Sequence, residues 1–366
     1  MKKLIAVVLC CVMVMSLVSC SFFEVDISKE KETKPEGVSS ASKVEDENGD
    51  IETQIAKKLD DFNGIVYLTD KNGKVIYSGA SGKDEKGNAL SVSSPMFIGS
   101  VSKQFCAAAI LMLSEQGKLS IEDTLDKYFP QYESGKKVTI KNLLSMRSGI
   151  PEMLDHLDGV SVDKTESENI QWINEWVYEQ PFDFEPDTQL AYSNTNYLLL
   201  SQIVEKVSGE YYSDFIRKNI FEPLEMNDSG FVLEVEDNEF FSKSLTYDTF
   251  EFQVEQAGAA KGAGDIVSTA ADMDKWMKGL VNGKIISEEN YQEMIKDHSP
   301  DNAEHYGYGI MGFYKKGKGH SGRIGTYLSL DYISTDEEYY MFASTNETDN
   351  KIMNIPALVM DILTDK

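Results

Sequence analysis

The chain has 366 residues, too many for one simple hydrophobic core, and 41% of them are apolar, which is ordinary for a soluble globular protein. It carries 35 Lys and Arg against 61 Asp and Glu, a formal net charge of −26 that is spread along the sequence. Such an acidic surface repels nucleic acids and other polyanions, so nucleic-acid binding is excluded. The 4 histidines show no metal-ligand spacing, and no metal is expected.

Residues 1–19 have the features of a secretion signal. Lys2 and Lys3 precede an apolar run that ends at Val18 and is shorter than the ~20 residues that a membrane-spanning helix needs. The ending "LVSC" resembles the lipobox of bacterial lipoproteins. This resemblance implies cleavage before Cys20, a lipid on the Cys20 sulfur, and an extracytoplasmic protein held to the bacterial membrane by that anchor alone. The alternative is an uncleaved signal anchor.

Residues 20–52 follow as a polar segment rich in Lys, Glu, Ser and Asp, a composition typical of a disordered tether. A tether of about 30 residues spans roughly 30 Å, so the folded body, residues 53–366, would lie off the membrane and within reach of the cell wall. Cys106 is the one cysteine of that body, since Cys10 and Cys11 lie in the signal. We expect it to be a small core residue without an intrachain disulfide.

Regular patterns in the body predict strands near both of its ends and helices between them. An alternating pattern around an Asn-Gly turn predicts a β-hairpin over residues 63–82, and three β-rich stretches lie between residues 306 and 346. We expect an α+β fold, in which an antiparallel β-sheet built from both chain ends is flanked by helices and carries an inserted, mainly helical lobe. Helical periodicity predicts helices over residues 97–116, 139–150, 196–209, 210–224, 268–283 and 353–363.

A Ser-x-x-Lys motif opens the first of these helices. Ser100 and Lys103 would share one face at the helix N-terminus, where the positive dipole end and free N–H groups lie. Partial burial would lower the pKa of Lys103, which could then accept the proton of the Ser100 hydroxyl. Four other Ser-x-x-Lys matches fall in polar segments, so the motif alone is better explained as a serine cap beside a solvated lysine.

Two further short motifs lie far along the chain. Tyr192-x-Asn194 precedes a predicted helix, and by itself it fits a loop tyrosine with a turn asparagine equally well. His320-Ser321-Gly322 comes just before the strand "TYLSLDYIS", where it places a polar edge beside a glycine that permits close backbone approach. Taken alone, this second motif is better explained as a turn between two strands.

Together the three motifs resemble those of the serine β-lactamase and penicillin-binding protein superfamily, in its class C β-lactamase and DD-peptidase-like branch, where the middle motif is Tyr-x-Asn. Their order and wide spacing agree, and the segments "TIKNLLSMRSGI", "IFEPLEMNDSGF" and "YGYGI" also look like the family. The resemblance runs from residue 62 to the chain end. It implies an antiparallel sheet flanked by helices plus a helical lobe, with the site between them.

For the residues, the resemblance implies a serine hydrolase that works through an acyl-enzyme intermediate. Ser100 would attack a carbonyl carbon. Lys103 and Tyr192 would take its proton and deliver it to the leaving group, and the sequence leaves the choice of base between them open. Asn194 would position Lys103 and the substrate amide, and no cofactor is needed.

The resemblance also implies an oxyanion hole made by the backbone N–H groups of Ser100 and Arg323, and substrate binding by His320, Ser321 and Gly322. His320 departs from β-lactamases of this type, which have Lys there, while some D-Ala-D-Ala carboxypeptidases, D-aminopeptidases and esterases of the family have His. With an ordinary pKa of ~6.5, His320 would attract a substrate carboxylate only as the pH falls.

The sequence therefore predicts an extracytoplasmic serine hydrolase, foremost a D-Ala-D-Ala carboxypeptidase-like enzyme acting on cell-wall peptides. A β-lactamase, an esterase or a D-amino-acid amidase of the same family are alternatives, because pocket loops decide the substrate. A non-catalytic penicillin-binding-like protein is a fourth. The partner is a small peptide, amide or ester, and the oligomeric state and physiological role are not encoded in any motif.

Overall fold

The computed structural model describes residues 50–161, 163–247, 254–299, 305–348 and 350–364. The predicted signal peptide, the predicted lipidation site Cys20 and the tether up to residue 49 lie outside the described residues. In the described ranges, no helix combines the length and the apolar character of a membrane span.

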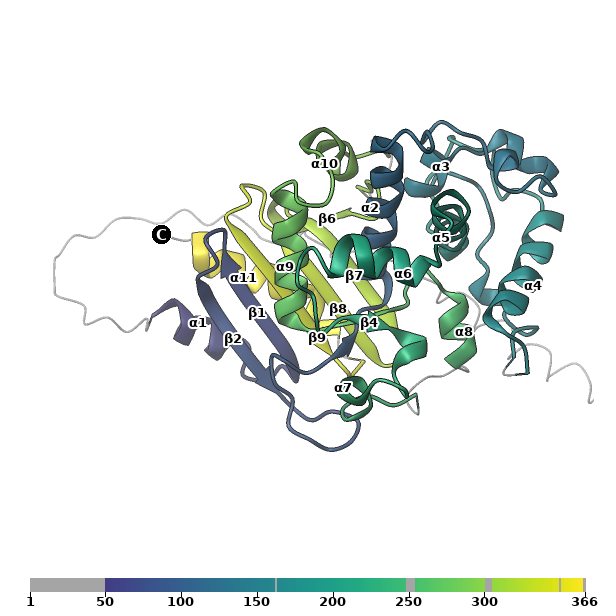
Figure 1. The fold of residues 1–366 in the computed structure, drawn as a ribbon. Coiled ribbons are helices and arrows are strands. Elements are labelled where there is room, and N and C mark those ends of the chain that lie inside the picture. The colour runs from purple at the N-terminus through teal and green to yellow at the C-terminus, as the bar shows by residue number, and fades with distance from the viewer. Residues whose placement is uncertain (1–49, 162, 248–253, 300–304, 349, 365–366) are drawn as a thin grey trace, which may run out of the picture. The chain divides into compact units, whose positions relative to one another are not determined.

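The largest element of the fold is a six-stranded antiparallel sheet with the order β2-β1-β9-β8-β7-β6 (Figure 1). β1 and β2 form the predicted hairpin, and β1 also pairs with β9, so that Tyr67 lies opposite Phe342. The predicted α+β class and the sheet built from both chain ends are thus confirmed. The strands are β1 (Gly64–Asp70), β2 (Val75–Ser81), β6 (Met311–Gly312), β7 (Lys318–Ile324), β8 (Tyr327–Ile333) and β9 (Tyr339–Thr345).

One face of the sheet packs against two helices from opposite ends of the described chain, α1 (Ile51–Lys58) and α11 (Ile355–Thr364). α1 begins beside the boundary expected between residues 52 and 53. Every second side chain along these strands points to this face. These side chains pack against the two helices, and the contact excludes water. They are Val66, Leu68, Leu330, Tyr332, Met341 and Ala343.

The other face of the sheet packs against α2 (Ser102–Glu115) and α9 (Ala270–Val281). The two helices meet where the Phe105 ring stacks on the Trp276 ring, with 4.0 Å between centroids. Most residues of α2 are buried, Cys106 among them, as expected. Thr269 caps α9 by accepting a hydrogen bond from the Asp272 N–H, which confirms one of the two capping residues that the pattern allows.

The predicted helix over residues 97–116 is wrong at its start. Residues Met96–Phe97 form β3 of a small second sheet with the order β3-β5-β4, and Gly99–Val101 form a 3-10 turn before α2 begins. The partners of β3 are β5 (Ile266–Ser268) and β4 (Gly230–Phe231). Pairing with β5 holds the apolar residues at the start of the run extended, so tertiary contacts override their helical pattern.

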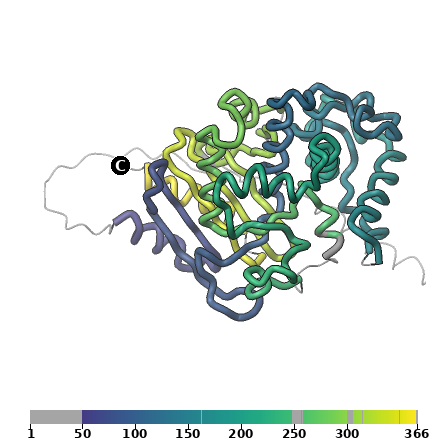
Figure 2. Tube along the Cα trace, viewed as in Figure 1, coloured from purple at the N-terminus to yellow at the C-terminus, as the bar shows by residue number. Residues whose placement is uncertain are grey.

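The middle portion of the chain forms the inserted lobe, which is mainly helical. The chain leaves the sheet to form this lobe and then returns to the sheet (Figure 2). The predicted helix over residues 139–150 ends early because Met146 takes a positive φ of 58°. The predicted helix over residues 210–224 instead breaks into a short α-helix and a π-helical turn, Arg217–Phe221. The helices outside the sheet faces are α3 (Ile140–Leu144), α4 (Glu166–Glu179), α5 (Asn194–Ser208), α6 (Tyr212–Ile216), α7 (Glu239–Ser242), α8 (Val254–Ala259) and α10 (Glu288–Ile295).

Candidate active site

Ser100 lies in the 3-10 turn that leads into α2, and Lys103 lies in the first turn of that helix. Lys103 is fully buried, whereas Ser100 is partly exposed. The Lys103 Nζ atom lies 3.0 Å from the Ser100 Oγ atom. The spacing of three residues therefore brings an amine and a solvent-accessible hydroxyl into hydrogen-bond contact.

Two further acceptors surround the Lys103 amine. Asn194 Oδ1 lies 2.7 Å from Nζ, and the Ala263 carbonyl oxygen lies 2.6 Å from it. Both oxygens can only accept, whereas the Ser100 hydroxyl can accept or donate. An ammonium group is satisfied by donating to all three, and a neutral amine by donating to two and accepting from Ser100. The contacts therefore suit Lys103 before and after a proton transfer.

Asn194 is the first residue of α5, and Tyr192 lies two residues before it. The Lys103 Nζ atom lies 4.8 Å from the centre of the Tyr192 ring. The same ring contacts the His320 ring, with 6.1 Å between centroids. The fold thus gathers the three sequence motifs around one buried lysine, although they lie in three distant parts of the chain.

Glu152 belongs to this site but to none of the motifs. Its Oε2 atom accepts from the Asn194 backbone nitrogen at 2.7 Å and from Asn194 Nδ2 at 2.9 Å, while Oε1 accepts from the Leu154 nitrogen at 2.9 Å. The carboxylate therefore caps α5 at its positive end. Because it binds Nδ2, it also fixes Oδ1 of Asn194 toward Lys103. A position directly after "SGIP" carries no sequence signal for this contact.

Gly322 lets strand β7 touch the turn that carries Ser100. A Cβ atom at Gly322 would lie 2.0 Å from the Ile98 carbonyl oxygen and 2.9 Å from the Ser100 nitrogen. A Cβ atom at Gly99, which has a φ of 49°, would lie 2.7 Å from the Arg323 nitrogen. The backbone segments that carry the Ser100 and Arg323 nitrogens are therefore in close contact, as two donors to a single oxyanion require.

His320 lies inside β7 and is only 1% exposed, so the expectation of a turn or strand end at this motif is wrong. Nδ1 donates to the Ser321 carbonyl oxygen, and Nε2 of the neutral ring accepts from the Tyr306 hydroxyl at 3.2 Å. Burial and the nearby Lys103 charge lower the pKa of His320 to about 3. The expectation of a histidine that gains charge near pH 6.5 is therefore also wrong.

The rest of the predicted substrate-binding strand is unevenly exposed. Gly322 is buried, Ser321 is partly exposed, and Arg323 is exposed. The Arg323 Nε atom lies 3.5 Å from the Gly325 carbonyl oxygen. Solvent and a substrate can therefore reach a cation on β7 at Arg323, but not at His320.

A buried polar network supports His320 from the neighbouring strand. Asp331 on β8 accepts from the His320 nitrogen at 2.7 Å and from Gln104 Nε2 at 2.8 Å. Gln104 Oε1 in turn accepts from Trp276 Nε1 at 2.8 Å. Burial raises the pKa of Asp331 to about 7. The network ties β7 to α2 and α9, which fixes the strand against the helix that carries Lys103.

Comparison with known proteins agrees with this geometry. A family model described as Beta-lactamase matches residues 52–356. The putative penicillin-binding protein PbpX of Bacillus subtilis strain 168 is 29% identical over 260 residues, which cover 69% of this chain and 62% of that protein. The match to Penicillin-binding protein 4* of the same organism, 28% identical, also spans 62% of that protein. The chain thus spans less than two thirds of the length of these two relatives.

Two further proteins are similar over more of their length. Teichoic acid D-alanine hydrolase of Staphylococcus aureus strain MRSA252 is 24% identical over 311 residues, 82% of this chain and 75% of that protein. The structure of D-amino acid amidase from Ochrobactrum anthropi SV3 complexed with L-phenylalanine superposes with a TM-score of 0.74 at 21% identity, over 86% of this chain and 98% of that one. The chain belongs to the beta-lactamase family.

Proposed function

We propose that the protein hydrolyses D-aminoacyl esters or amides at the bacterial cell envelope, with Ser100 as nucleophile. The observation that carries the choice of substrate is the enclosed, uncharged His320. The imidazole is neutral throughout the physiological pH range, so this position gives no electrostatic attraction to a substrate carboxylate. The neighbouring Glu152 carboxylate adds negative charge beside Asn194, which further disfavours an anionic substrate group.

The chemistry assigned to the site is acyl transfer in two halves. The Ser100 oxygen attacks the substrate carbonyl, and its proton passes to Lys103 or Tyr192 and then to the departing alcohol or amine. The oxyanion that forms is stabilised by the backbone N–H groups of Ser100 and Arg323. Water then attacks the acyl-enzyme and gives its proton to the same groups. This step releases the acid and restores the Ser100 hydroxyl.

The names of two similar proteins support the ester and amide proposal. One is named a teichoic acid D-alanine hydrolase, and a similar fold is that of a D-amino acid amidase. The envelope location rests on three expectations from the sequence, a signal over residues 1–19, a lipid anchor at Cys20 and a polar tether, which together would place the site among wall polymers.

A D-Ala-D-Ala carboxypeptidase is the second candidate, and Arg323 is the observation that favours it. Its side chain is exposed and follows directly after Gly322 on the strand that borders Ser100. A guanidinium there could pair with the terminal carboxylate of a peptide, a contact for which arginine geometry is well suited.

One set of substrates separates the two candidates. The purified folded part would be assayed with D-alanine methyl ester, L-alanine methyl ester and a tripeptide that ends in D-Ala-D-Ala, with Ser100→Ala as the blank. We expect the highest kcat/KM for the D-alanine ester, and Arg323→Ala to leave it within a few-fold. Faster cleavage of the tripeptide, lost on Arg323→Ala, would instead establish the carboxypeptidase.

A further inference from the structure

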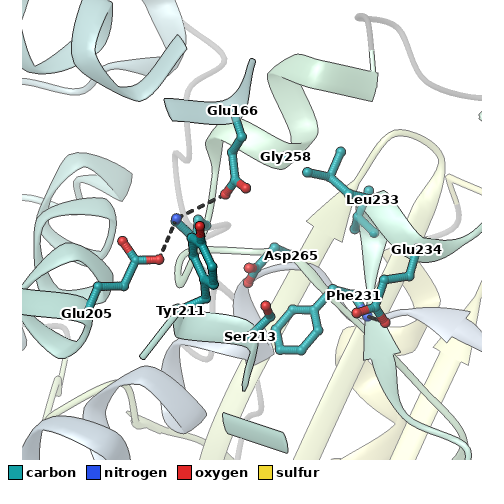
Figure 3. Close-up of a pocket in the computed structure, with 11 residues that line it drawn as sticks. Glu166, Glu205, Tyr211, Ser213, Phe231, Leu233, Glu234, Gly258 and Asp265 are labelled. Atoms are coloured by element: carbon teal, nitrogen blue, oxygen red, sulfur yellow. Dashed lines mark hydrogen bonds and ion pairs between the residues drawn. The ribbon is translucent and has the colours of Figure 1, made fainter. Parts of the chain in front are cut away.

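A cavity of about 140 Å³ opens beside α4, α5 and α6, and none of its lining residues belongs to the three motifs (Figure 3). Its polar side is built around Lys261, which is 9% exposed. The Lys261 Nζ atom lies 3.0 Å from Glu166 Oε1 and 2.8 Å from Glu205 Oε1, the two contacts dashed in Figure 3. One cation thus faces two carboxylates, and the group keeps a net negative charge.

Asp265 adds a third carboxylate, and its hydrogen bonding is incomplete. It lines the cavity and is only 5% exposed. Oδ1 accepts from the Gly262 nitrogen at 3.0 Å, whereas no other residue of the described ranges donates a hydrogen bond to Oδ2. Burial raises the pKa of Asp265 to about 7, so a positive charge beside this carboxyl group would favour its ionised form. A ligand cation that donates to Oδ2 would supply that charge.

The mouth of the same cavity is apolar and open to solvent. Tyr211 is 74% exposed and Leu233 is 42% exposed, and both line the cavity together with Phe231. Large apolar side chains that remain exposed around a recess are typical of a binding site. Aromatic faces also attract organic cations. The cavity therefore combines an anionic floor with an apolar, partly aromatic mouth.

We propose that this cavity binds a small organic ammonium ion with an apolar substituent, its nitrogen beside Asp265 Oδ2 and its apolar part between Tyr211 and Leu233. Metal binding does not fit as well, because in the described ranges no three His, Cys, Asp or Glu side chains are placed to hold a metal ion. A neutral or anionic ligand would leave the excess of carboxylates uncompensated.

The cavity and the catalytic lysine share one loop. Lys261 and Asp265 flank Ala263, whose carbonyl oxygen accepts from Lys103 Nζ at 2.6 Å. The segment is held on the other side by the Asp265 carbonyl, which accepts from the Val232 nitrogen at 2.8 Å. A ligand that binds Asp265 or competes for the partners of Lys261 therefore acts on the backbone that positions Lys103, and its binding would change the rate of Ser100 acylation.

The test uses benzylammonium as the probe. Binding would be measured by calorimetry and by protein NMR on the folded chain, before and after Ser100 is blocked with a fluorophosphonate, and benzyl alcohol and phenylacetate would serve as the neutral and anionic controls. We expect benzylammonium to bind in both forms and to bind more tightly than either control. Asp265→Asn and Tyr211→Ala should each weaken it by roughly tenfold, the usual effect of one charge-assisted hydrogen bond or one aromatic contact.

Phe240→Ala is the matched control variant, since Phe240 is an exposed aromatic outside the cavity, and it should bind the probe as the parent does. In kinetic assays with a neutral ester, saturating benzylammonium should change kcat/KM by about twofold or more, and Tyr211→Ala should raise the concentration that gives half of this effect. Equal binding of benzyl alcohol, or loss of binding once Ser100 is blocked, would overturn the site. Binding with an unchanged kcat/KM would overturn its coupling to Lys103.

Discussion

Glu152 and Asn194 are joined by two hydrogen bonds to the same carboxylate oxygen, one from the backbone nitrogen and one from the side-chain amide of Asn194. The pair decides which end of the Asn194 amide faces Lys103. With Nδ2 held by Glu152, Oδ1 must point to the lysine, where it lies 2.7 Å from Nζ. A carboxylate outside the motifs thus orients a residue inside them, and it does so from the N-terminus of α5.

Glu152→Gln should slow acylation by about an order of magnitude. A glutamine can donate a hydrogen bond to Asn194 as well as accept one, so the side-chain amide of Asn194 could flip and turn Oδ1 away from Lys103. KM for a neutral ester should change little, since Glu152 acts through Asn194. Pre-steady-state acylation rates would be compared with those of Glu179→Gln, an exposed glutamate at the end of α4. Loss of thermal stability with an unchanged acylation rate would show that Glu152 only caps the helix.

Ser100→Ala should lose nearly all hydrolysis, and a fluorophosphonate adduct should map by mass spectrometry to Ser100. Lys103→Ala should be almost as damaging. Tyr192→Phe should lose on the order of 10²-fold if the phenol carries the proton. Ser93→Ala, at an exposed serine, is the control. An adduct on another serine, or an active Ser100→Ala enzyme, would remove Ser100 as the nucleophile.

His320 should make stability rise with pH on the acidic side. Its folded pKa of about 3 lies below the ordinary ~6.5 of the unfolded chain, so only the unfolded state binds the proton between these values. The difference in unfolding free energy between the parent and His320→Gln should therefore climb by up to about 1.4 kcal/mol per pH unit toward pH 6.5 and be flat above it.

The ratio of carboxylate to ester kcat/KM should not vary from pH 5.5 to 8.5; a rise on acidification would show a charged His320.

Asp331 should have the opposite effect and make the stability of the folded protein fall as the pH rises. Its folded pKa of about 7 lies above the ordinary ~3.9, so the folded state holds the proton between these values and stability falls as the pH rises through them. Urea unfolding of the parent and Asp331→Asn from pH 4.5 to 8 should show the parent losing stability relative to the variant up to pH 7. Because folding releases the His320 proton and favours the Asp331 proton over much of the same pH range, the two slopes oppose each other in the parent. A constant difference between the two proteins would contradict the assignment.

Cys20→Ala should leave the full-length protein unprocessed or release it to the medium, because the lipobox-like ending "LVSC" would lose the sulfur that carries the lipid. Detergent-phase partitioning and the mass of the N-terminal peptide measure this directly. Cys106→Ala, at a cysteine buried in α2, is the control for a general effect of removing a thiol. Partitioning of Cys20→Ala identical to that of the parent would refute the lipid anchor.

The sequence by itself determined the elements whose signals are local. The alternation of residues 64–81 around Asn72-Gly73 specifies a hairpin, because side chains of period two cover one face of a strand and the turn residues accept the conformation that closes it. The run that contains Ser100 and Lys103 places an amine and a hydroxyl three residues apart on one face at a helix start. The other two partners of the buried Lys103 amine come from distant parts of the chain.

Only the tertiary structure decided the start of α2, the state of His320 and the contact of Glu152. Phe97 is extended because it pairs with β5, more than a hundred residues away. His320 is neutral because β7 is buried against Tyr306 and α2, and burial in low dielectric disfavours charge whatever the ordinary pKa of the side chain. Glu152 reaches Asn194 because the lobe folds back on itself. Each of these depends on which groups share a space after folding, and desolvation and long-range hydrogen bonds leave no pattern in the order of the residues.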